Sequence, residues 1–418
     1  MLALIVGGTE RHTGRTAADP PLIIGGLSLA ERAVLAAQRA GIVRSVVVGV
    51  SDPGGEVTGR LRARGANVSF VDWRSLQHLD TAGGLLLINE GVLVEPRAVE
   101  QLLEVHSTQG VPGVLMAVGD ATDPDLAVLP ASGADALMGA ASAQAFLARL
   151  ALLAPWEEVS VAPFFCRRLD PGCDPAAVET AYIQHQNGRE SFFTKKIRKF
   201  SVPLSRVLAR RGVGPNVVTF MGLLLAVAAA MAVSVDIYVV SLIGALLYYA
   251  SMVLDCSDGE VARLTFRDSR FGAWFETAVD YVTYFLLLGA LVLAGQARGD
   301  GGRELEAAMI AVAGSLVVVA VAGYLRQRVA GKDPGQFDYA SAAVLRSSTP
   351  FHRFARWGRQ WIKRSTIAHL IVAFAIVDQL WVMIYLWAFG AVVASVVILA
   401  VEPFVVRRVK VAAPGAQA

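Results

Sequence analysis

Residues 251–290 read SMVLDCSDGEVARLTFRDSRFGAWFETAVDYVTYFLLLGA and place four acidic side chains between two long apolar runs. Asp255 and Asp258 are three residues apart, and Glu276 and Asp280 are four apart. On an α-helix each of these spacings brings both carboxylates to one face. The pattern predicts two helices that present paired acids to a common site.

Apolar segments continue on both sides of this stretch. Six of them have roughly the length needed to span a membrane, near 216–235, 237–254, 273–296, 306–325, 366–380 and 382–403. The 418-residue chain is 55% hydrophobic and 17% charged, which is too apolar for an ordinary soluble protein. Buried helices of a large soluble core are the alternative, but charges confined to one set of loops favour an all-α domain of six transmembrane helices.

Basic residues lie beside the apolar segments. The stretch 195–211 carries seven Lys or Arg and no acid, and the loop 326–364 carries nine basic residues. Because such residues gather on the cytoplasmic side, we expect the N-terminal domain and the acidic site to face the cytoplasm of a prokaryotic cell membrane. The net charge of +3 gives no ground for a nucleic-acid partner, whereas the local positive charge suits anionic lipid headgroups.

Four converging carboxylates near hydrocarbon repel one another unless they bind a cation. Oxygen ligands without Cys or His favour Mg²⁺ or Mn²⁺, held by Asp255, Asp258, Glu276 and Asp280, and such ions suit phosphoryl chemistry. Alternatively, these acids form ion pairs with nearby arginines and bind no metal ion.

The same residues closely resemble the signature of the CDP-alcohol phosphotransferase family, D-x2-D-G-x2-A-R-x8-G-x3-D-x3-D. Its eight positions are filled by Asp255, Asp258, Gly259, Ala262, Arg263, Gly272, Glu276 and Asp280. Family members also have six transmembrane helices, a basic amphipathic segment before the first helix, and Pro-Asn-x-x-Thr at its start, matched here by Pro215, Asn216 and Thr219. The resemblance covers about residues 195–405.

This resemblance implies metal-dependent transfer of a substituted phosphate group from a CDP-linked donor, such as CDP-diacylglycerol or a CDP-polyol, to an alcohol, with release of CMP. It assigns the metal to the four acids and the role of catalytic base to Asp280. It assigns CDP binding to Pro215, Asn216, Thr219, Asp258, Gly259, Ala262, Arg263 and Gly272. It also implies a homodimer in the lipid bilayer. Glu276 stands where the family has aspartate, and its extra methylene puts full activity in question.

An acceptor that carries its own phosphate, such as a polyol phosphate, would need additional positive charge near the site. Arg326 and Arg328 are the candidate acceptor-binding residues. The segment 353–364, RFARWGRQWIKR, interleaves aromatic and basic residues at helical spacing, which favours an amphipathic helix at the membrane interface over a substrate site.

Residues 1–165 have a different pattern, in which short apolar runs at 2–6, 45–50 and 84–88 alternate with helical stretches such as 28–40. This predicts an α/β domain with a parallel sheet covered by helices. Residues 166–194 are polar and rich in turn formers, which predicts a linker to the membrane domain at 195–418. Three cysteines without a CxxC pair fit a reducing environment.

Residues 3–50 resemble the start of a sugar-nucleotidyltransferase domain, a Rossmann-like fold, through Gly7, Gly8 and Thr9 of a phosphate-binding loop and through Gly25, Gly26, Gly41 and Gly49. Active members carry a lysine before the GG turn and a mid-domain aspartate. This chain has Asp19-Pro20-Pro21 and Ile88-Asn89-Glu90-Gly91 there, so the catalytic parts are degraded.

Fusions of a cytidylyltransferase to a CDP-alcohol phosphotransferase resemble this layout. Three hypotheses follow. The leading one is a transferase with an inactive N-terminal domain. The others are a bifunctional enzyme that also makes the CDP-alcohol from CTP, and a non-catalytic membrane scaffold.

Overall fold

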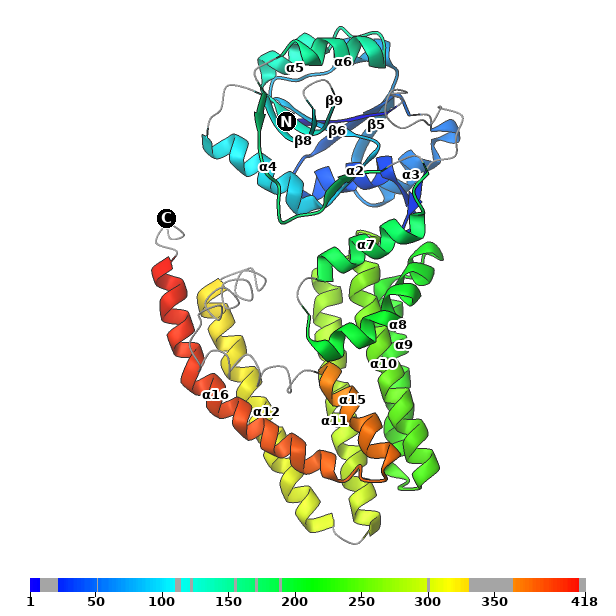
Figure 1. Ribbon diagram of the computed structural model, residues 1–418, viewed down its shortest axis with the longest axis vertical. Helices are drawn as coiled ribbons and strands as arrows, with labels where there is room; N and C mark the ends of the chain where they lie inside the picture. Colours follow the sequence, from blue (N-terminus) through cyan, green and yellow to red (C-terminus); the bar gives the residue numbers. More distant parts are fainter. Residues whose placement is uncertain are drawn as a thin grey trace. The chain divides into compact units, whose positions relative to one another are not determined.

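The computed structural model describes residues 1–7, 22–50, 52–109, 114–120, 123–153, 156–169, 172–187, 190–298, 301–330 and 364–412. Two compact units are present (Figure 1). The first comprises Met1–Gly188, Arg206–Gly212 and Val261–Arg267, and the second comprises Arg189–Ser205, Val213–Glu260 and Asp268–Ala418. Each unit is described by itself below.

The first unit is built on a sheet that, in the described residues, has seven strands in the order β10-β8-β9-β6-β1-β4-β5. The strands are β1 (Leu2–Val6), β4 (Arg44–Val48), β5 (Asn67–Val71), β6 (Leu85–Asn89), β8 (Val114–Asp120), β9 (Asp123–Leu129) and β10 (Trp156–Glu158). Strands β6, β1, β4 and β5 pair in parallel, which confirms the predicted parallel sheet. Strand β9 is antiparallel to both of its neighbours, β6 and β8. Its pairing with β8 must be antiparallel, because only two residues separate the two strands and no crossover can fit there.

Helices cover both faces of this sheet (Figure 1). They are α2 (Leu29–Arg39), α3 (Glu56–Ala63), α4 (Pro96–Gln109), α5 (Ala131–Leu137) and α6 (Ala143–Ala151). Strand β1 shows why two cores form: Ala3 and Ile5 pack in one cluster, and Leu2, Leu4 and Val6 pack in the other. Successive side chains of a strand point to opposite faces, so a continuous apolar run is buried on both sides.

Smaller elements complete the first unit. Strands β2 (Ile23–Ile24) and β3 (Leu27–Ser28) form a hairpin, and β7 (Val92–Val94) pairs with β11 (Cys166–Arg168). Short 3-10 helices span Pro53–Gly55 and Trp73–His78. The range predicted as a linker, 166–194, contains β11 and the helix α7 (Pro175–Asn187). The sequence did not predict these two elements, because the range is polar and rich in turn formers.

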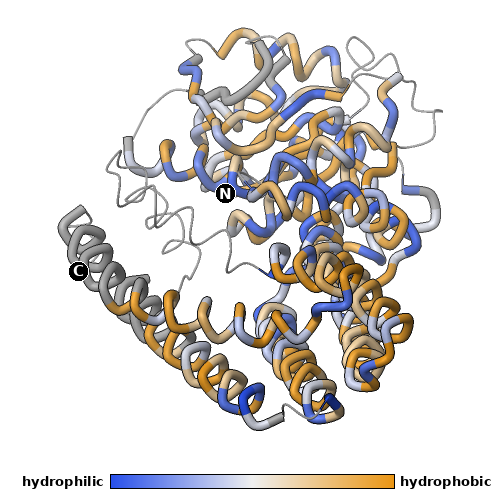
Figure 2. The backbone as a smooth tube through the Cα atoms, turned by 60° about the horizontal axis from the view of Figure 1, so that its bottom comes forward, coloured by the Kyte–Doolittle hydropathy of each residue, from blue (hydrophilic) through white to orange (hydrophobic). Residues whose placement is uncertain are grey.

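The second unit is helical. Its helices are α8 (Phe192–Arg210), α9 (Pro215–Ser234), α10 (Tyr238–Leu264), α11 (Arg270–Arg298), α12 (Gly301–Ala330), α15 (Arg364–Ile376) and α16 (Val382–Ala412). The last turn of α8 and the residues of α10 from 261 onward belong to the first unit. Long stretches of these helices are hydrophobic and are drawn in orange in Figure 2.

Three of the described helices, α9, α10 and α11, are long and apolar enough to cross a membrane. Apolar residues such as Leu224 and Phe285 are exposed on them, as expected for surfaces that face lipid. The other three predicted segments lie largely in the helices α12, α15 and α16, although α15 ends at Ile376, and their role as membrane spans stays a prediction.

Small residues allow these helices to pack closely. A Cβ atom on Gly244 of α10 would lie 2.9 Å from the Ala229 carbonyl oxygen of α9. A Cβ atom on Gly314 of α12 would lie 3.0 Å from the backbone of Ala391 in α16. Glycine and alanine at such crossings let two backbones approach, which is typical of membrane helices.

Candidate active site

The N-terminal end of α9 contacts the signature residues on α10 and α11. The hydroxyl of Thr219 donates a 2.6 Å hydrogen bond to the buried carboxylate of Asp258. A Cβ atom on Gly272 would lie 3.2 Å from the side-chain oxygen of Asn216, so the glycine permits close contact between α11 and α9. The Pro-Asn-x-x-Thr motif and the acidic signature therefore meet in one place.

The four acids lie on two helices, as their spacing predicted. Asp255 and Asp258 are on α10, and Glu276 and Asp280 are in the first turns of α11. Asp280 lies within hydrogen-bonding reach of Asp255, and Glu276 is close enough to interact electrostatically with both Asp258 and Asp280. The two helices thus bring four carboxylates to a common region, where like charges repel unless a cation intervenes.

Arg364 supplies positive charge in that region. Its Nη1 donates a 2.7 Å hydrogen bond to Asp255 and also pairs with Asp280, and only 13% of its side chain is exposed. Arg364 is the first residue of α15 and the last residue of the basic segment that the sequence assigned to the membrane interface. Its contacts link this end of α15 to the acids of α10 and α11.

The acids suit a divalent cation in their chemistry, because they offer only oxygen donors and already attract a guanidinium. Among the described residues, however, no group of three or more His, Cys, Asp or Glu side chains is arranged to hold a metal ion. The metal site at Asp255, Asp258, Glu276 and Asp280 therefore stays a prediction.

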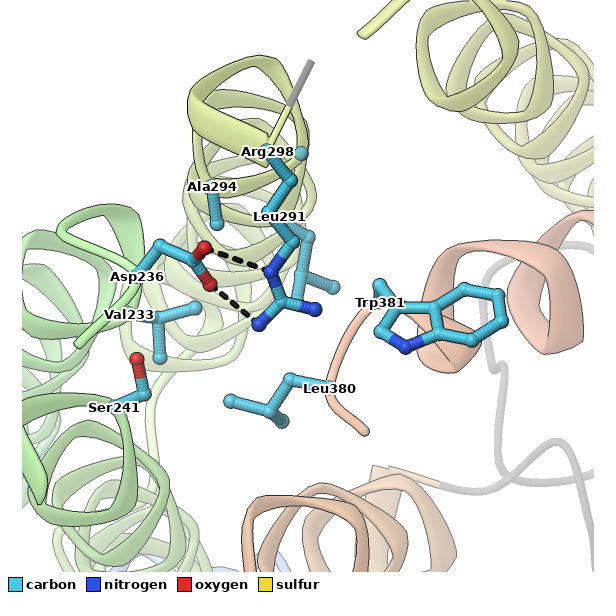
Figure 3. Close-up of a pocket in the computed structure, with 9 residues that line it drawn as sticks. Val233, Asp236, Ser241, Leu291, Ala294, Arg298, Leu380 and Trp381 are labelled. Carbon is cyan, nitrogen blue, oxygen red and sulfur yellow. Dashed lines mark hydrogen bonds and ion pairs between the residues drawn. The ribbon is translucent and has the colours of Figure 1, made fainter. Parts of the chain in front are cut away.

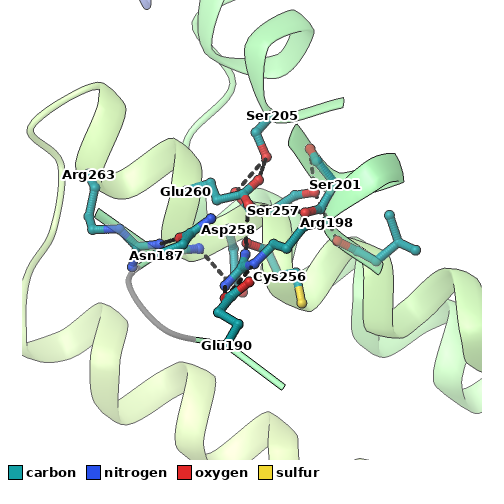
Figure 4. A network of polar contacts seen from close by, with 12 residues as sticks. Asn187, Glu190, Arg198, Ser201, Ser205, Cys256, Ser257, Asp258, Glu260 and Arg263 are labelled. Atoms are coloured by element: carbon teal, nitrogen blue, oxygen red, sulfur yellow. Dashed lines mark hydrogen bonds and ion pairs between the residues drawn. The ribbon is translucent and has the colours of Figure 1, made fainter. Parts of the chain in front are cut away.

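A second polar network fixes α8 against α10 (Figure 4). Glu260, next to Gly259, has a fully buried side chain and accepts hydrogen bonds from Arg198 at 2.7 Å, Ser201 at 3.1 Å and Ser205 at 2.5 Å. These three donors share one face of α8, at spacings of three and four residues. Nothing in the signature marks Glu260, which occupies one of its unspecified positions.

Arg198 is the centre of this network. It also donates to Glu190 at 2.9 Å and to the Cys256 carbonyl at 3.0 Å. Burial opposes its charge, but Cys256, Glu190 and Glu260 outweigh that effect and the pKa of Arg198 is raised. The basic helix predicted before the first span, α8, is thus hydrogen-bonded to α10, which carries Asp255 and Asp258.

The remaining signature residues, Gly259, Ala262 and Arg263, lie on α10. The Gly259 amide is 2.6 Å from an Asp258 carboxylate oxygen. Arg263, in the last turn of α10, donates to the side-chain oxygen of Asn187 at 2.9 Å, and Ala262 precedes it. Both Arg263 and Asn187 belong to the first unit.

Several predicted site residues fall where the structure does not describe the side chains or the backbone. Arg326 and Arg328 lie in α12, where their side chains are not described, and residues 331–363 lie outside the described residues. Gly8 and Thr9 of the N-terminal loop also lie outside them. Gly7 is described, and a Cβ atom there would lie 2.3 Å from Glu90, so this glycine allows close packing of two loops.

A small hollow lies at the opposite end of α9, near Asp236 (Figure 3). Asp236 and Arg298 are the charged residues that line it, and they form a two-point ion pair with 2.7 and 2.5 Å bonds. Because these two charges cancel, the hollow offers no net positive charge to a phosphate.

Comparison with known proteins shows that the region containing the four acids matches a known protein family. The family model described as CDP-alcohol phosphatidyltransferase matches residues 213–346, which include all eight signature positions. This region is a CDP-alcohol phosphatidyltransferase domain.

Two curated proteins resemble part of the chain. "Bifunctional IPC transferase and DIPP synthase" of Archaeoglobus fulgidus is 31% identical over 130 residues, which are 31% of this chain and 24% of the relative. "Archaetidylinositol phosphate synthase" of Pyrococcus horikoshii is 31% identical over 110 residues, which are 25% of this chain and 56% of the relative. The matches span about a quarter and about half of these relatives.

Proposed function

We propose that this chain is an integral membrane enzyme that transfers a substituted phosphate group from a CDP-linked donor to an alcohol and releases CMP. The observation that carries the proposal is the meeting of Asp258 with Thr219, and of Asp255 and Asp280 with Arg364, in a CDP-alcohol phosphatidyltransferase domain. The product enters phospholipid or polar-lipid synthesis.

The proposed roles follow from the placement of each group. Arg263 and the backbone near Gly259 bind the diphosphate of the donor, with Thr219 holding the Asp258 carboxylate in position. A divalent cation bound by the acids would neutralise the phosphates and make CMP a better leaving group. Arg364 supplies positive charge beside Asp255 and Asp280.

The proposed reaction is a displacement at phosphorus. The acceptor oxygen forms a bond to the phosphorus that bears the transferred group, and the bond from that phosphorus to the bridging oxygen of CMP breaks. CMP leaves with the bonding electron pair, and the proton of the acceptor hydroxyl passes to the carboxylate of Asp280. Positioning and charge neutralisation account for most of the rate in such reactions.

The membrane arrangement is part of the proposal. Six transmembrane helices place the basic segment 195–211 and the acidic site on the cytoplasmic side of a prokaryotic membrane, and two copies form a homodimer. A lipid or polyol donor and an alcohol or polyol-phosphate acceptor both reach the site from that side. The name of the Pyrococcus relative makes an inositol phosphate the first acceptor to test.

The test is CMP release by the purified full chain in lipid vesicles with Mg²⁺ or Mn²⁺, CDP-diacylglycerol or a CDP-polyol, and a set of polyol phosphates. Asp280→Asn should lower kcat by roughly 10²–10⁴-fold, the usual contribution of a general base. Glu306→Gln, which changes an exposed acid of α12, is the matched control and should leave kcat unchanged. Undiminished CMP release by Asp280→Asn would refute the assignment of the base.

The bifunctional alternative receives support from the name of the Archaeoglobus relative. Against it, Asn89 stands in place of the mid-domain aspartate, and its side chain accepts a 3.0 Å hydrogen bond from the Gly91 amide. CTP-dependent formation of a CDP-polyol by the full chain would establish this second activity. Absence of CMP release with every donor, including from Glu276→Asp, would instead favour the scaffold hypothesis.

A further inference from the structure

The end of α10 has an unusual conformation. Residue Phe266 has a positive φ of 54°, a region that favours glycine. The Arg267 amide donates to the Ala262 carbonyl at 2.9 Å, which closes the helix in a Schellman motif with Phe266 at its left-handed position. A bulky residue at this position needs compensation from its surroundings.

The compensation comes from the core of the first unit. Phe266 is 9% exposed and belongs to the same hydrophobic cluster as Ile5 and Val34. The guanidinium of Arg32, a residue of α2 that is 1% exposed, lies 4.9 Å from the ring of Phe266 and 4.9 Å from the ring of Tyr182. Phe266 is therefore a core residue of an α/β unit although it follows a helix of the transferase domain.

Three arginines bind the carbonyls that the end of α10 leaves free. Arg32 donates to Leu264 at 2.6 Å, Arg64 donates to Thr265 at 2.8 Å, and Arg39 donates to Phe266 at 3.3 Å. The last carbonyls of a helix lack partners within it and carry partial negative charge, which cations stabilise. Consecutive carbonyls are thus capped by side chains from α2 and from the residue that follows α3.

The glycine turn between β2 and β3 is shaped for the same segment. A Cβ atom on Gly25 would lie 2.5 Å from the Leu264 side chain. The Gly25 amide donates at 2.8 Å to Glu179, a buried acid that also pairs with Arg206 and Arg210. In the sequence this turn is part of the resemblance to a nucleotidyltransferase domain, and in the structure it accommodates the end of α10.

We infer that Arg32 and Phe266 are positioning residues for the donor site, and that the α/β unit acts by holding the last turn of α10. Arg263 lies in that turn, and Asp258 lies five residues earlier on the same helix, about 7.5 Å along its axis. This inference rests on the proposed function. A fixed helix end keeps Arg263 pre-organised where the donor diphosphate would bind, so displacing this end weakens donor binding.

The experiment uses the full chain in lipid vesicles and two readouts. The first is KM for the CDP-linked donor compared with kcat. The second is hydrogen–deuterium exchange of the backbone amides in 260–268. Arg32→Lys keeps the positive charge but loses the planar guanidinium between two rings. It should raise the donor KM about tenfold with kcat within about threefold, and should speed amide exchange in this segment.

Two further variants separate positioning from folding. Phe266→Gly suits the left-handed conformation but removes the ring, so it should also raise the donor KM. A wild-type KM in this variant would show that only the backbone conformation matters and would overturn the inference. Arg64→Gln removes one half-buried contact and should raise KM by about threefold even if Arg32→Lys unfolds. Arg62→Gln, an exposed arginine of α3, is the matched control and should change neither readout.

The outcomes also separate this inference from the function on which it rests. Faster exchange with an unchanged donor KM in Arg32→Lys would overturn the positioning role while the transferase stands. Absence of CMP release from the wild-type protein would overturn the proposed function and the donor-site role together, while the exchange data would still report whether the arginines hold the helix end.

Discussion

Replacing Glu260 by alanine should destabilise the helical unit, because it leaves a partly buried arginine without its main counter-ion. The Glu260 side chain is fully buried, and 19% of the Arg198 side chain is exposed. Removing one partner of a buried ion pair usually costs about 3–5 kcal/mol. Arg198 keeps its bond to Glu190, so we expect the lower end of that range, about 3 kcal/mol.

The assay is thermal unfolding of the purified full chain in detergent. For a unit of this size a loss of 3 kcal/mol lowers Tm by roughly 6–12 °C. Glu260→Gln keeps an acceptor for Ser205 and should lower Tm by about half as much. Glu306→Gln, on the exposed side of α12, should leave Tm within about 1 °C. A Glu260→Ala protein with the Tm of the wild type would refute the account of this network.

Two further predictions concern the first unit. Gly25→Ala places a Cβ atom 2.5 Å from the Leu264 side chain at a residue whose φ is 59°. The substitution should therefore destabilise this unit by about 2–4 kcal/mol, which would be measured as a lower midpoint of unfolding in urea. An unchanged midpoint would contradict the close packing. Burial and, to a smaller extent, the charge of Asp125 raise the pKa of Cys166 to about 12, so its thiolate fraction at pH 8 is about one in ten thousand. Alkylation of Cys166 at pH 8 should therefore be much slower than in the urea-unfolded chain, as peptide mass spectrometry would show, and equal rates would contradict its burial.

The acidic site could be predicted largely from local spacing. Asp255 and Asp258, and Glu276 and Asp280, are close on their helices because three or four residues make one turn. Arg364 could not be predicted in the same way, because it lies 109 residues from Asp255 and its partners depend on how α15 packs. Its basic and aromatic neighbours favoured a membrane interface instead.

The fold shows the same limit. The apolar runs predicted the strands β1, β4 and β6, but the direction of β9 depends on the length of its connection to β8. The sequence predicts a helix over 28–40 but not the burial of Arg32, which lies between the rings of Tyr182 and Phe266, the latter more than 230 residues later in the chain. Contacts of this kind are properties of the tertiary structure, and local sequence patterns do not carry them.

The presence of Phe266 in the core of the α/β unit has a consequence for the order of folding during synthesis. That core is incomplete until residues 189–267 have been synthesised, and at typical translation rates this takes roughly 4–16 s after Gly188 is added. During that interval α9 and α10, two of the helices that are long and apolar enough to cross a membrane, are synthesised while the ribosome-bound α/β region still lacks one of its own core side chains. Under the proposed membrane arrangement, maturation of the N-terminal region therefore depends on the insertion step, and a defect in insertion would leave its folding intermediate open to chaperones and proteases.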